Sequence, residues 1–268
     1  MRPISSRPKK EALSGGVFLA ILSDETIVLG ARPYSNTSLI VTLLTKGHGK
    51  LRLVAKGVRS AKSRVGVGLE PASESHVEWS QRGGSDLGTM RKCETTRVYQ
   101  RLWKDYEAMQ VASRFLKILD VVLGVREGER AHYQLLRTSL EALEKGLDTA
   151  GMEGVFLLML LKTMGLGPGL DYCAACEKKP GGETARFDVA TGELRCARCP
   201  EPLAREMRLR AGAVAAMREI LGLTPDKCYS IRFAGSLGSE IIGCAEAFLQ
   251  YHGGKYLPKR SGRTPVSR

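Results

Sequence analysis

The chain has 268 residues, of which 43% are hydrophobic, so it can build a packed core, and disorder over most of its length is excluded. Its 41 Lys and Arg against 28 Asp and Glu give a formal charge of +13, which favours a polyanionic partner; a generally basic proteome is the alternative explanation. Seven cysteines, an odd number, argue against a secreted disulfide framework, and no apolar run approaches the ~18 residues that span a bilayer. We therefore expect a cytoplasmic protein without a membrane segment.

The first part of the chain has the pattern of an arm followed by β-strands. Residues 1–16 are polar, basic and rich in Gly, Ser and Pro, which indicates a disordered arm. Between residues 17 and 100, short runs of β-branched and apolar residues alternate with turn signals. Because no helical pattern intervenes, these strands predict a small closed barrel of the oligonucleotide-binding (OB) type. The expected strands cover residues 26–29, 39–44, 51–56, 75–79 and 87–98.

After Trp103 the apolar residues recur every three to four positions, as they do on one face of a helix. We expect residues 101–257 to form an all-α domain with an insert at 171–202, which makes the whole chain a multi-domain α+β protein. The tail 258–268 is basic and expected to be flexible. The expected helices cover residues 109–123, 133–147, 155–164, 211–221 and 240–251.

The charge of the barrel region is one-sided, because no Asp or Glu occurs between Glu25 and Glu70. A solvated surface usually mixes both signs, whereas a surface of one sign suits a groove that follows phosphates. Tyr34, His48 and Trp79 are candidates for stacking on bases, with core packing as an equal explanation and, for Trp79, the better one. The expected DNA-binding residues are Arg32, Tyr34, Lys46, Lys50, Arg52, Lys56, Arg59, Lys62 and Arg64.

Four of the cysteines form two CxxC pairs, and these pairs are the most specific local pattern in the chain. Each pair can place two thiolates on one tight turn, and two such turns complete the tetrahedron of a closed, structural zinc site. Residues 187–194 have the pattern of a hairpin that would bring the two pairs together. A redox pair or unrelated thiols are the alternatives, although a redox CxxC should open a helix beside a βαβ unit. The expected ligands of one structural Zn2+ are Cys173, Cys176, Cys196 and Cys199.

No residue pattern indicates catalysis, and we expect neither catalytic residues nor enzymatic activity. The chain has no Gly-x-x-x-x-Gly-Lys-Ser/Thr loop and no GxGxxG after a strand, and acidic residues are too sparse in the barrel region for a two-metal nuclease centre. The histidines His48, His76, His132 and His252 are scattered along the chain. A nucleic-acid-modifying enzyme with an unrecognised site is the alternative. Cys93, Cys228 and Cys244 are expected to be buried thiols.

Several segments between about residue 17 and 257 carry a recognisable pattern: residues 25–29, 34–38, 41–53 (VTLLTKGHGKLRL), 54–59, 62–64, 69–71 and 86–89. Together they resemble the RecO family of recombination mediators. The cysteine segment also looks like the zinc knuckle that many members of this family carry. Two features depart from the family pattern: the N-terminal arm is longer than usual, and Glu70-Pro71 stands where Gln-Pro is more common.

The resemblance implies a nucleoid-associated protein that binds single- and double-stranded DNA and anneals complementary strands. It further implies that the protein remodels DNA coated by single-strand-binding protein and, with RecR, helps to load RecA. A groove of the helical domain is expected to bind the acidic, apolar C-terminal tail of single-strand-binding protein, with Arg205, Arg208, Arg210 and Arg218 as candidates. The alternative function is that of a sequence-nonspecific RNA-binding zinc protein.

Overall fold

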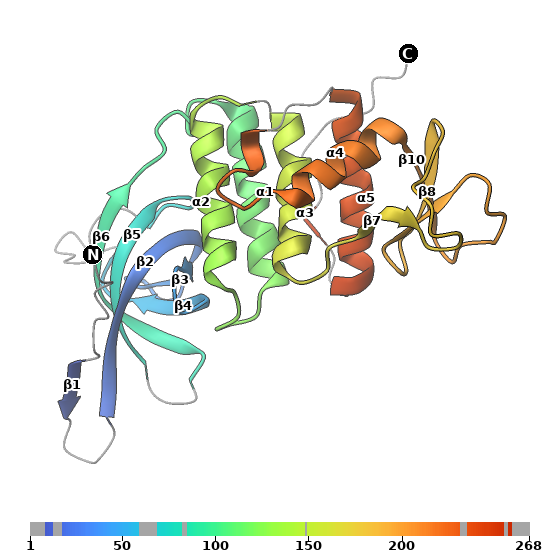
Figure 1. The fold of residues 1–268 in the computed structure, drawn as a ribbon. Coiled ribbons are helices and arrows are strands. Elements are labelled where there is room, and N and C mark those ends of the chain that lie inside the picture. Colours follow the sequence, from blue (N-terminus) through green and yellow to red (C-terminus); the bar gives the residue numbers. More distant parts are fainter. Residues whose placement is uncertain are drawn as a thin grey trace, which may run out of the picture. The chain divides into compact units, whose positions relative to one another are not determined.

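The structure, a computed structural model, describes residues 9–12, 18–58, 69–81, 85–147, 149–230, 235–254 and 257–258. The chain forms two compact units (Figure 1). Unit 1 comprises Met1–Gln100 and Leu119–Tyr133, and unit 2 comprises Arg101–Ile118 and Gln134–Arg268. In the part of the chain that the structure describes, each helix is too short or too polar to cross a membrane.

Unit 1 contains a closed five-stranded barrel. β2 pairs with β3, β3 with β4, β4 with β6, β6 with β5, and β5 returns to β2, so that the sheet closes on itself. All of these pairs are antiparallel except β4 and β6, which are parallel. Each expected strand overlaps an observed one, which confirms the OB-type barrel. The strands are β2 (Phe18–Pro33), β3 (Leu39–Thr45), β4 (Lys50–Ala55), β5 (Glu74–Gln81) and β6 (Leu87–Arg97).

The barrel interior is filled by alternate residues of its strands, because successive side chains of a strand point to opposite faces. Leu43 of β3 and Leu51 and Leu53 of β4 belong to this core, together with Trp79 of β5. Trp79 is fully buried, so the core explanation of this residue is confirmed and its use for base stacking is wrong. The side chains that alternate with the core positions are left to form the outer surface of the barrel.

The expected N-terminal arm is partly ordered. Lys9–Ala12 form β1, which pairs antiparallel with residues 18–21 of β2. This pairing follows from the length of β2, whose first residues offer unpaired backbone groups to another strand. The rest of the expected arm and residues 259–268 of the expected tail lie outside the described residues.

Unit 2 contains the helical domain apart from residues 119–133, which belong to unit 1, and α3 (Thr149–Thr163) lies at its centre. Residues 152–161 of this helix are all buried, as expected for a helix that is apolar on every side. Phe156 of α3 stacks on Phe115 of α1 with ring centroids 4.0 Å apart. Each expected helix overlaps an observed one, and the other helices are α1 (Tyr106–Val122), α2 (Arg130–Glu144), α4 (Ala211–Gly222) and α5 (Gly235–Gly253), with a short 3-10 helix at Cys228–Ser230.

A four-stranded sheet in unit 2 forms the cysteine knuckle, which we define as residues 169–210. Its strands are ordered β10-β8-β9-β7. The expected hairpin is confirmed, because β8 and β9 pair antiparallel and Gly192 in their turn has a left-handed φ of 74°. A Cβ at Gly192 would lie 2.6 Å from Cζ of Phe248 in α5, so this turn requires glycine. The strands are β7 (Gly169–Cys173), β8 (Thr184–Asp188), β9 (Glu193–Cys196) and β10 (Glu206–Arg210).

Candidate metal centre and nucleic-acid interface

The four cysteines of the two CxxC pairs meet at one end of the knuckle. Their Sγ atoms all lie within 4.8 Å of one another, and none of the cysteines forms a disulfide. The Sγ–Sγ distances are 3.8 Å from Cys173 to Cys199, 3.9 Å from Cys176 to Cys196 and 3.5 Å from Cys196 to Cys199. A tetrahedral zinc with Zn–S bonds of about 2.3 Å requires an Sγ–Sγ edge of about 3.8 Å. The cluster is therefore compatible with a metal site.

Backbone hydrogen bonds place the two cysteine turns next to each other. The N–H of Ala174 donates to the Leu194 carbonyl at 2.8 Å, which fixes the first turn to β9. The N–H of Cys196 donates to Sγ of Cys173 at 3.3 Å, and the N–H of Cys199 closes the second turn on the Cys196 carbonyl at 3.2 Å. The β8–β9 hairpin thus carries the second pair back to the first, as the sequence pattern predicts.

The local environment shifts the pKa values of two cysteines of the cluster in opposite directions. Burial opposes ionisation of Cys173, but N–H groups of Cys196, Ala175 and Cys176 outweigh burial and lower its pKa to about 6. The hydrogen bond with Cys196, together with burial, raises the pKa of Cys199 to about 12. Four adjacent thiolates repel one another, so a bound cation is what would hold all four in the ionised form that metal ligands require.

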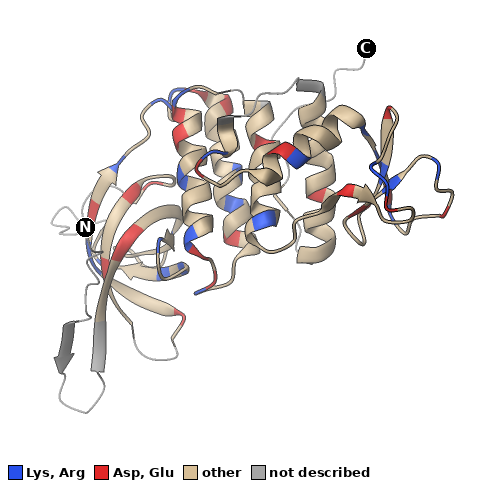
Figure 2. Ribbon diagram, viewed as in Figure 1, with Lys and Arg blue, Asp and Glu red and all other residues tan. Residues whose placement is uncertain are grey.

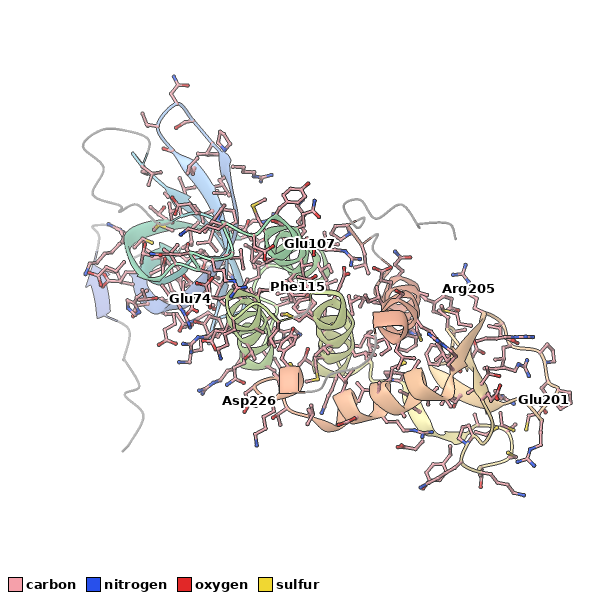
Figure 3. The ribbon with its side chains drawn as sticks, turned by 90° about the horizontal axis from the view of Figure 1, so that it is seen from above. Glu74, Glu107, Phe115, Glu201, Arg205 and Asp226 are labelled. Carbon is pink, nitrogen blue, oxygen red and sulfur yellow. The ribbon has the colours of Figure 1, made fainter. Side chains whose placement is uncertain are left out.

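Arg186 of β8 holds the second cysteine turn, a role that its place in the sequence does not reveal. Its Nη1 donates to the Cys199 carbonyl at 2.7 Å, and its Nη2 donates to the Glu201 carbonyl at 2.9 Å. Its Nε donates to the Glu206 carboxylate at 2.9 Å, which fixes the guanidinium on the sheet. Glu201 and Arg205 mark the β9–β10 loop in Figure 3. One arginine therefore joins the turn, the loop and β10.

The remaining three cysteines are buried, as expected. Cys93 lies in the barrel core, and Cys228 and Cys244 are buried in unit 2. Burial raises the pKa of Cys228 and of Cys244 to about 12, so both remain protonated thiols at neutral pH. These cysteines fill space in the core.

The outer face of β2, β3 and β4 carries exposed cations and no acid on β3 or β4. Arg52 alternates with the core residues Leu51 and Leu53 and therefore points outward. Across the strands, Arg52 pairs with Thr42, and Thr42 pairs with Gly30. The next outward row of paired residues consists of Val54, Ile40 and Arg32. We call this surface the β2–β4 face. Four of the expected DNA-binding residues are exposed on it or directly beyond its strands: Arg32, Tyr34 (59% exposed), Arg52 and Lys56.

The other expected cations are placed differently. Lys46 lies in the β3–β4 turn and forms an ion pair of 2.5 Å with Glu25, while His48 in the same turn lies 3.0 Å from Asp24. The expectation that Lys50 contacts DNA is wrong for this structure, because the residue is only 2% exposed. Arg59, Lys62 and Arg64 lie outside the described residues.

Lys50 is buried because a segment from beyond the barrel covers this end of the β2–β4 face. We call the segment, Leu119–Tyr133, the connector; it belongs to unit 1. Lys50 Nζ donates to the carbonyl of Asp120 at 2.5 Å and lies 3.1 Å from its carboxylate. Gly128 covers Leu44, since a Cβ at Gly128 would lie 3.5 Å from Leu44 Cδ1. The alternation of β4 correctly indicates an outward Lys50, but it carries no signal for the connector.

The opposite surface of the barrel, formed by β5 and β6, has both signs of charge. Glu78 pairs across the sheet with Lys92, and Lys92 forms an ion pair of 2.6 Å with Glu94. Figure 2 shows acidic residues on β5. This surface has the mixed charge of an ordinary solvated face, which singles out the β2–β4 face as the candidate nucleic-acid interface.

Comparison with known proteins agrees with this geometry. Residues 19–99 match the family model described as "Recombination protein O N terminal", and residues 104–261 match "Recombination protein O C terminal". The protein named "DNA repair protein RecO" of Moorella thermoacetica is 31% identical, over 88% of this chain and 88% of its own length. The proteins of the same name from Anaeromyxobacter sp. strain K (30%, covering 87% and 92%) and Symbiobacterium thermophilum (28%, covering 86% and 92%) are also similar. The chain thus belongs to the RecO family of DNA repair proteins.

Proposed function

We propose that this protein is a recombination mediator that binds DNA through the β2–β4 face and anneals complementary strands. With RecR, it helps to load RecA onto DNA coated by single-strand-binding protein in the cytoplasm, at the nucleoid. The observation that carries the proposal is the exposure of Arg32, Arg52 and Lys56 on a barrel face whose strands β3 and β4 bear no acid. The membership of the RecO family supports the repair role.

Binding through phosphates explains how such a face can assist annealing. Arg and Lys neutralise the backbone charge of a strand and release its counterions, while contacts to phosphates leave the base edges free to pair. Tyr34 is exposed beside Arg32 and can stack on a base of any identity. Two strands brought together in this way repel each other less and retain the groups that recognise the complement.

Anisotropy titrations of a labelled single-stranded oligonucleotide test this interface. With three to four phosphates neutralised, log K should fall with log salt at a slope of about −2 to −3. We expect the double variant Arg52→Glu, Lys56→Glu to weaken binding at least about thirtyfold at 0.1 M salt. The matched control is Lys92→Glu on the β5–β6 surface, which should change binding little.

Equal losses for the double variant and its control, or a slope near zero, would exclude the β2–β4 face. RNA of the same sequence serves as competitor in the same titration. Equal displacement by RNA and DNA would favour the RNA-binding alternative.

Strand annealing on coated DNA tests the mediator role. Complementary oligonucleotides that carry single-strand-binding protein should anneal faster with this protein than without it, and adding RecR should extend the effect to RecA loading. Annealing of naked strands alone would remove the single-strand-binding protein from the proposed partners.

We also propose that one Zn2+ is held by Cys173, Cys176, Cys196 and Cys199 and that its role is structural. When bound, the ion supplies cross-links between the two cysteine turns and neutralises part of their charge. Four thiolates would fill its coordination shell. The Sγ–Sγ distances of 3.5 to 3.9 Å and the outer contacts of Arg186 support this role.

For the tail of single-strand-binding protein we propose a cleft of about 630 Å³ in unit 2, between α2 and residues 223–229. Its basic Arg137, Lys145 and Lys227 and its apolar Leu147 and Leu223 suit an acidic, apolar peptide; the cleft is also lined by Asp226 and by Glu141, which forms an ion pair of 3.5 Å with Arg137. The four arginines expected from the sequence, Arg205, Arg208, Arg210 and Arg218, do not line this cleft.

A labelled tail peptide tests the cleft. Lys145→Glu should weaken its binding several-fold, whereas the control Arg208→Glu should not. If Arg208→Glu weakened peptide binding and Lys145→Glu did not, the tail would bind at the knuckle and not in this cleft.

A further inference from the structure

Arg126 is one of the connector residues that lie directly against β4. Its N–H donates to the Lys50 carbonyl at 2.7 Å, and the N–H of Lys50 donates to the Glu127 carbonyl at 2.8 Å. Lys50 is thus bonded to two successive connector residues, so the backbone of Arg126 and Glu127 lies beside the first residue of β4.

The side chain of Arg126 reaches the start of β6. Its Nη2 donates to the Ser85 carbonyl at 2.7 Å, and the residue is exposed. Leu87 of β6 pairs in parallel with Arg52 of β4, and Ser85 precedes Leu87 by two residues. Arg126 is therefore hydrogen-bonded to the chain two residues before the position of β6 that pairs with Arg52.

The carboxylates of the connector that approach this region are engaged elsewhere. Asp120 contacts the ammonium of Lys50, and the carboxylate of Glu127 accepts from the N–H of Gly124 at 2.7 Å. Within the described ranges, Arg126 forms no ion pair with a carboxylate. Its side-chain partner among these residues is the Ser85 carbonyl, which does not neutralise the guanidinium.

The backbone of Arg126 is in a conformation that favours glycine. Its φ is 65°, and a side chain at such an angle meets a steric cost that glycine does not. Ala72 and Glu177 share this conformation, with φ of 70° and 57°, so the angle by itself assigns no role to Arg126. It does make glycine a substitution that removes the guanidinium without straining the backbone.

We propose that Arg126 is a further DNA-contacting residue, which extends the cationic β2–β4 face onto the connector. The connector buries the ammonium of Lys50 and presents the guanidinium of Arg126 at the same end of β4. The ligand is a backbone phosphate of either DNA strand, without selection for sequence. The inference rests on the proposed DNA binding by this face.

The test compares Arg126→Gly and Arg126→Gln with Lys92→Gln, a control that removes one exposed positive charge from the β5–β6 surface. Both Arg126 variants should bind a single-stranded oligonucleotide about five- to eightfold more weakly at 0.1 M salt, and the slope of log K against log salt should become shallower by about 0.7. Lys92→Gln should change neither quantity by a comparable amount.

Thermal unfolding separates binding from folding. Arg126→Gly should melt no lower than the parent, since glycine relieves the left-handed backbone. Unchanged affinity and slope in both Arg126 variants would overturn the inference, as would a lower melting temperature of Arg126→Gly with unchanged DNA affinity, which would assign Arg126 a structural role.

Arg52→Gln is measured in the same series. If it weakens binding while the Arg126 variants do not, only the extension to the connector fails. If Arg52→Gln and the Arg126 variants all bind like the parent, both the extension to the connector and the proposed DNA binding by the β2–β4 face are excluded.

Discussion

The barrel and the knuckle are both small sheets, but they are held together by different means. The barrel closes through the β2–β5 pair around an apolar core that includes Trp79, Leu43 and Leu53. The knuckle sheet is open at β10 and β7, and its cysteine turns contain only Ala and Arg between their thiols. Burial of apolar surface can therefore hold the barrel, whereas the knuckle turns depend on what joins their sulfurs.

The largest effect is expected from removing a thiolate of the cluster. Cys176→Ser, or treatment with a strong chelator, should release one zinc per chain and abolish the protection of residues 169–210 from hydrogen exchange. Barrel peptides should keep their protection because their core contains no metal ligand. Metal analysis and exchange mass spectrometry measure both effects, and Cys244→Ala is the matched control that should retain zinc. A zinc-free chain whose residues 169–210 remain fully protected from exchange would show that the knuckle, like the barrel, is held together without a metal.

The second prediction concerns the contact between Lys50 of β4 and Asp120 of the connector. Asp120→Ala leaves the buried ammonium of Lys50 with only a carbonyl partner, and since Asp120 is itself 43% exposed we expect a loss of about 2 kcal/mol in the free energy of unfolding. Lys50→Met should cost about 1 kcal/mol or less, because it removes the buried charge together with its need for a partner. Urea unfolding measures both. A larger loss for Lys50→Met would mean that the ion pair itself stabilises the barrel.

The third prediction concerns Arg186, which positions the second cysteine turn of the knuckle. Replacing it with Gln removes the donors to the Cys199 and Glu201 carbonyls and should lower zinc affinity about ten- to a hundredfold, as loss of outer contacts does in other metal sites. Competition with a chromogenic chelator measures the affinity. Arg208→Gln is the control, because Arg208 pairs with Arg186 across the sheet but is 81% exposed at its side chain. Equal affinities of the two variants would contradict this role of Arg186.

The smallest effect is a pH dependence of unit 1. Burial lowers the pKa of His132 below its ordinary value of 6.5, although Glu129 opposes the shift. The unfolded chain therefore takes up this proton first as the pH falls, so stability is complete above about pH 6.5 and decreases below it. His132→Asn should reduce the loss of stability between pH 7.5 and 5, measured by urea unfolding. An identical pH dependence in parent and variant would exclude His132 as a cause.

The knuckle was predictable because its signal is local. Two CxxC pairs and a hairpin between them lie within 27 residues, and backbone geometry alone brings the pairs together. The barrel strands were predictable for a similar reason, since alternation and turn residues identify each strand by itself.

The candidate interface was predictable only in part. Alternation along β4 shows that Lys50 and Arg52 share a face, but Lys50 meets Asp120, which lies 70 residues later in the sequence. Arg126 and Arg186 act through contacts with distant carbonyls, and a single arginine in the sequence carries no signal for such contacts. The left-handed backbone of Arg126 is likewise invisible in the residue type.

The cover over Leu44 has a practical consequence for dissecting the protein. Leu44 is fully buried on the outer side of the barrel, where Gly128 packs on it. A truncated chain that stops at Gln100 would leave this leucine and the ammonium-bearing end of β4 bare, and such apolar patches promote self-association. Ending the chain at Tyr133 instead would expose Phe115, which stacks on Phe156, so the barrel is best studied within the full chain even though its strands end at Arg97.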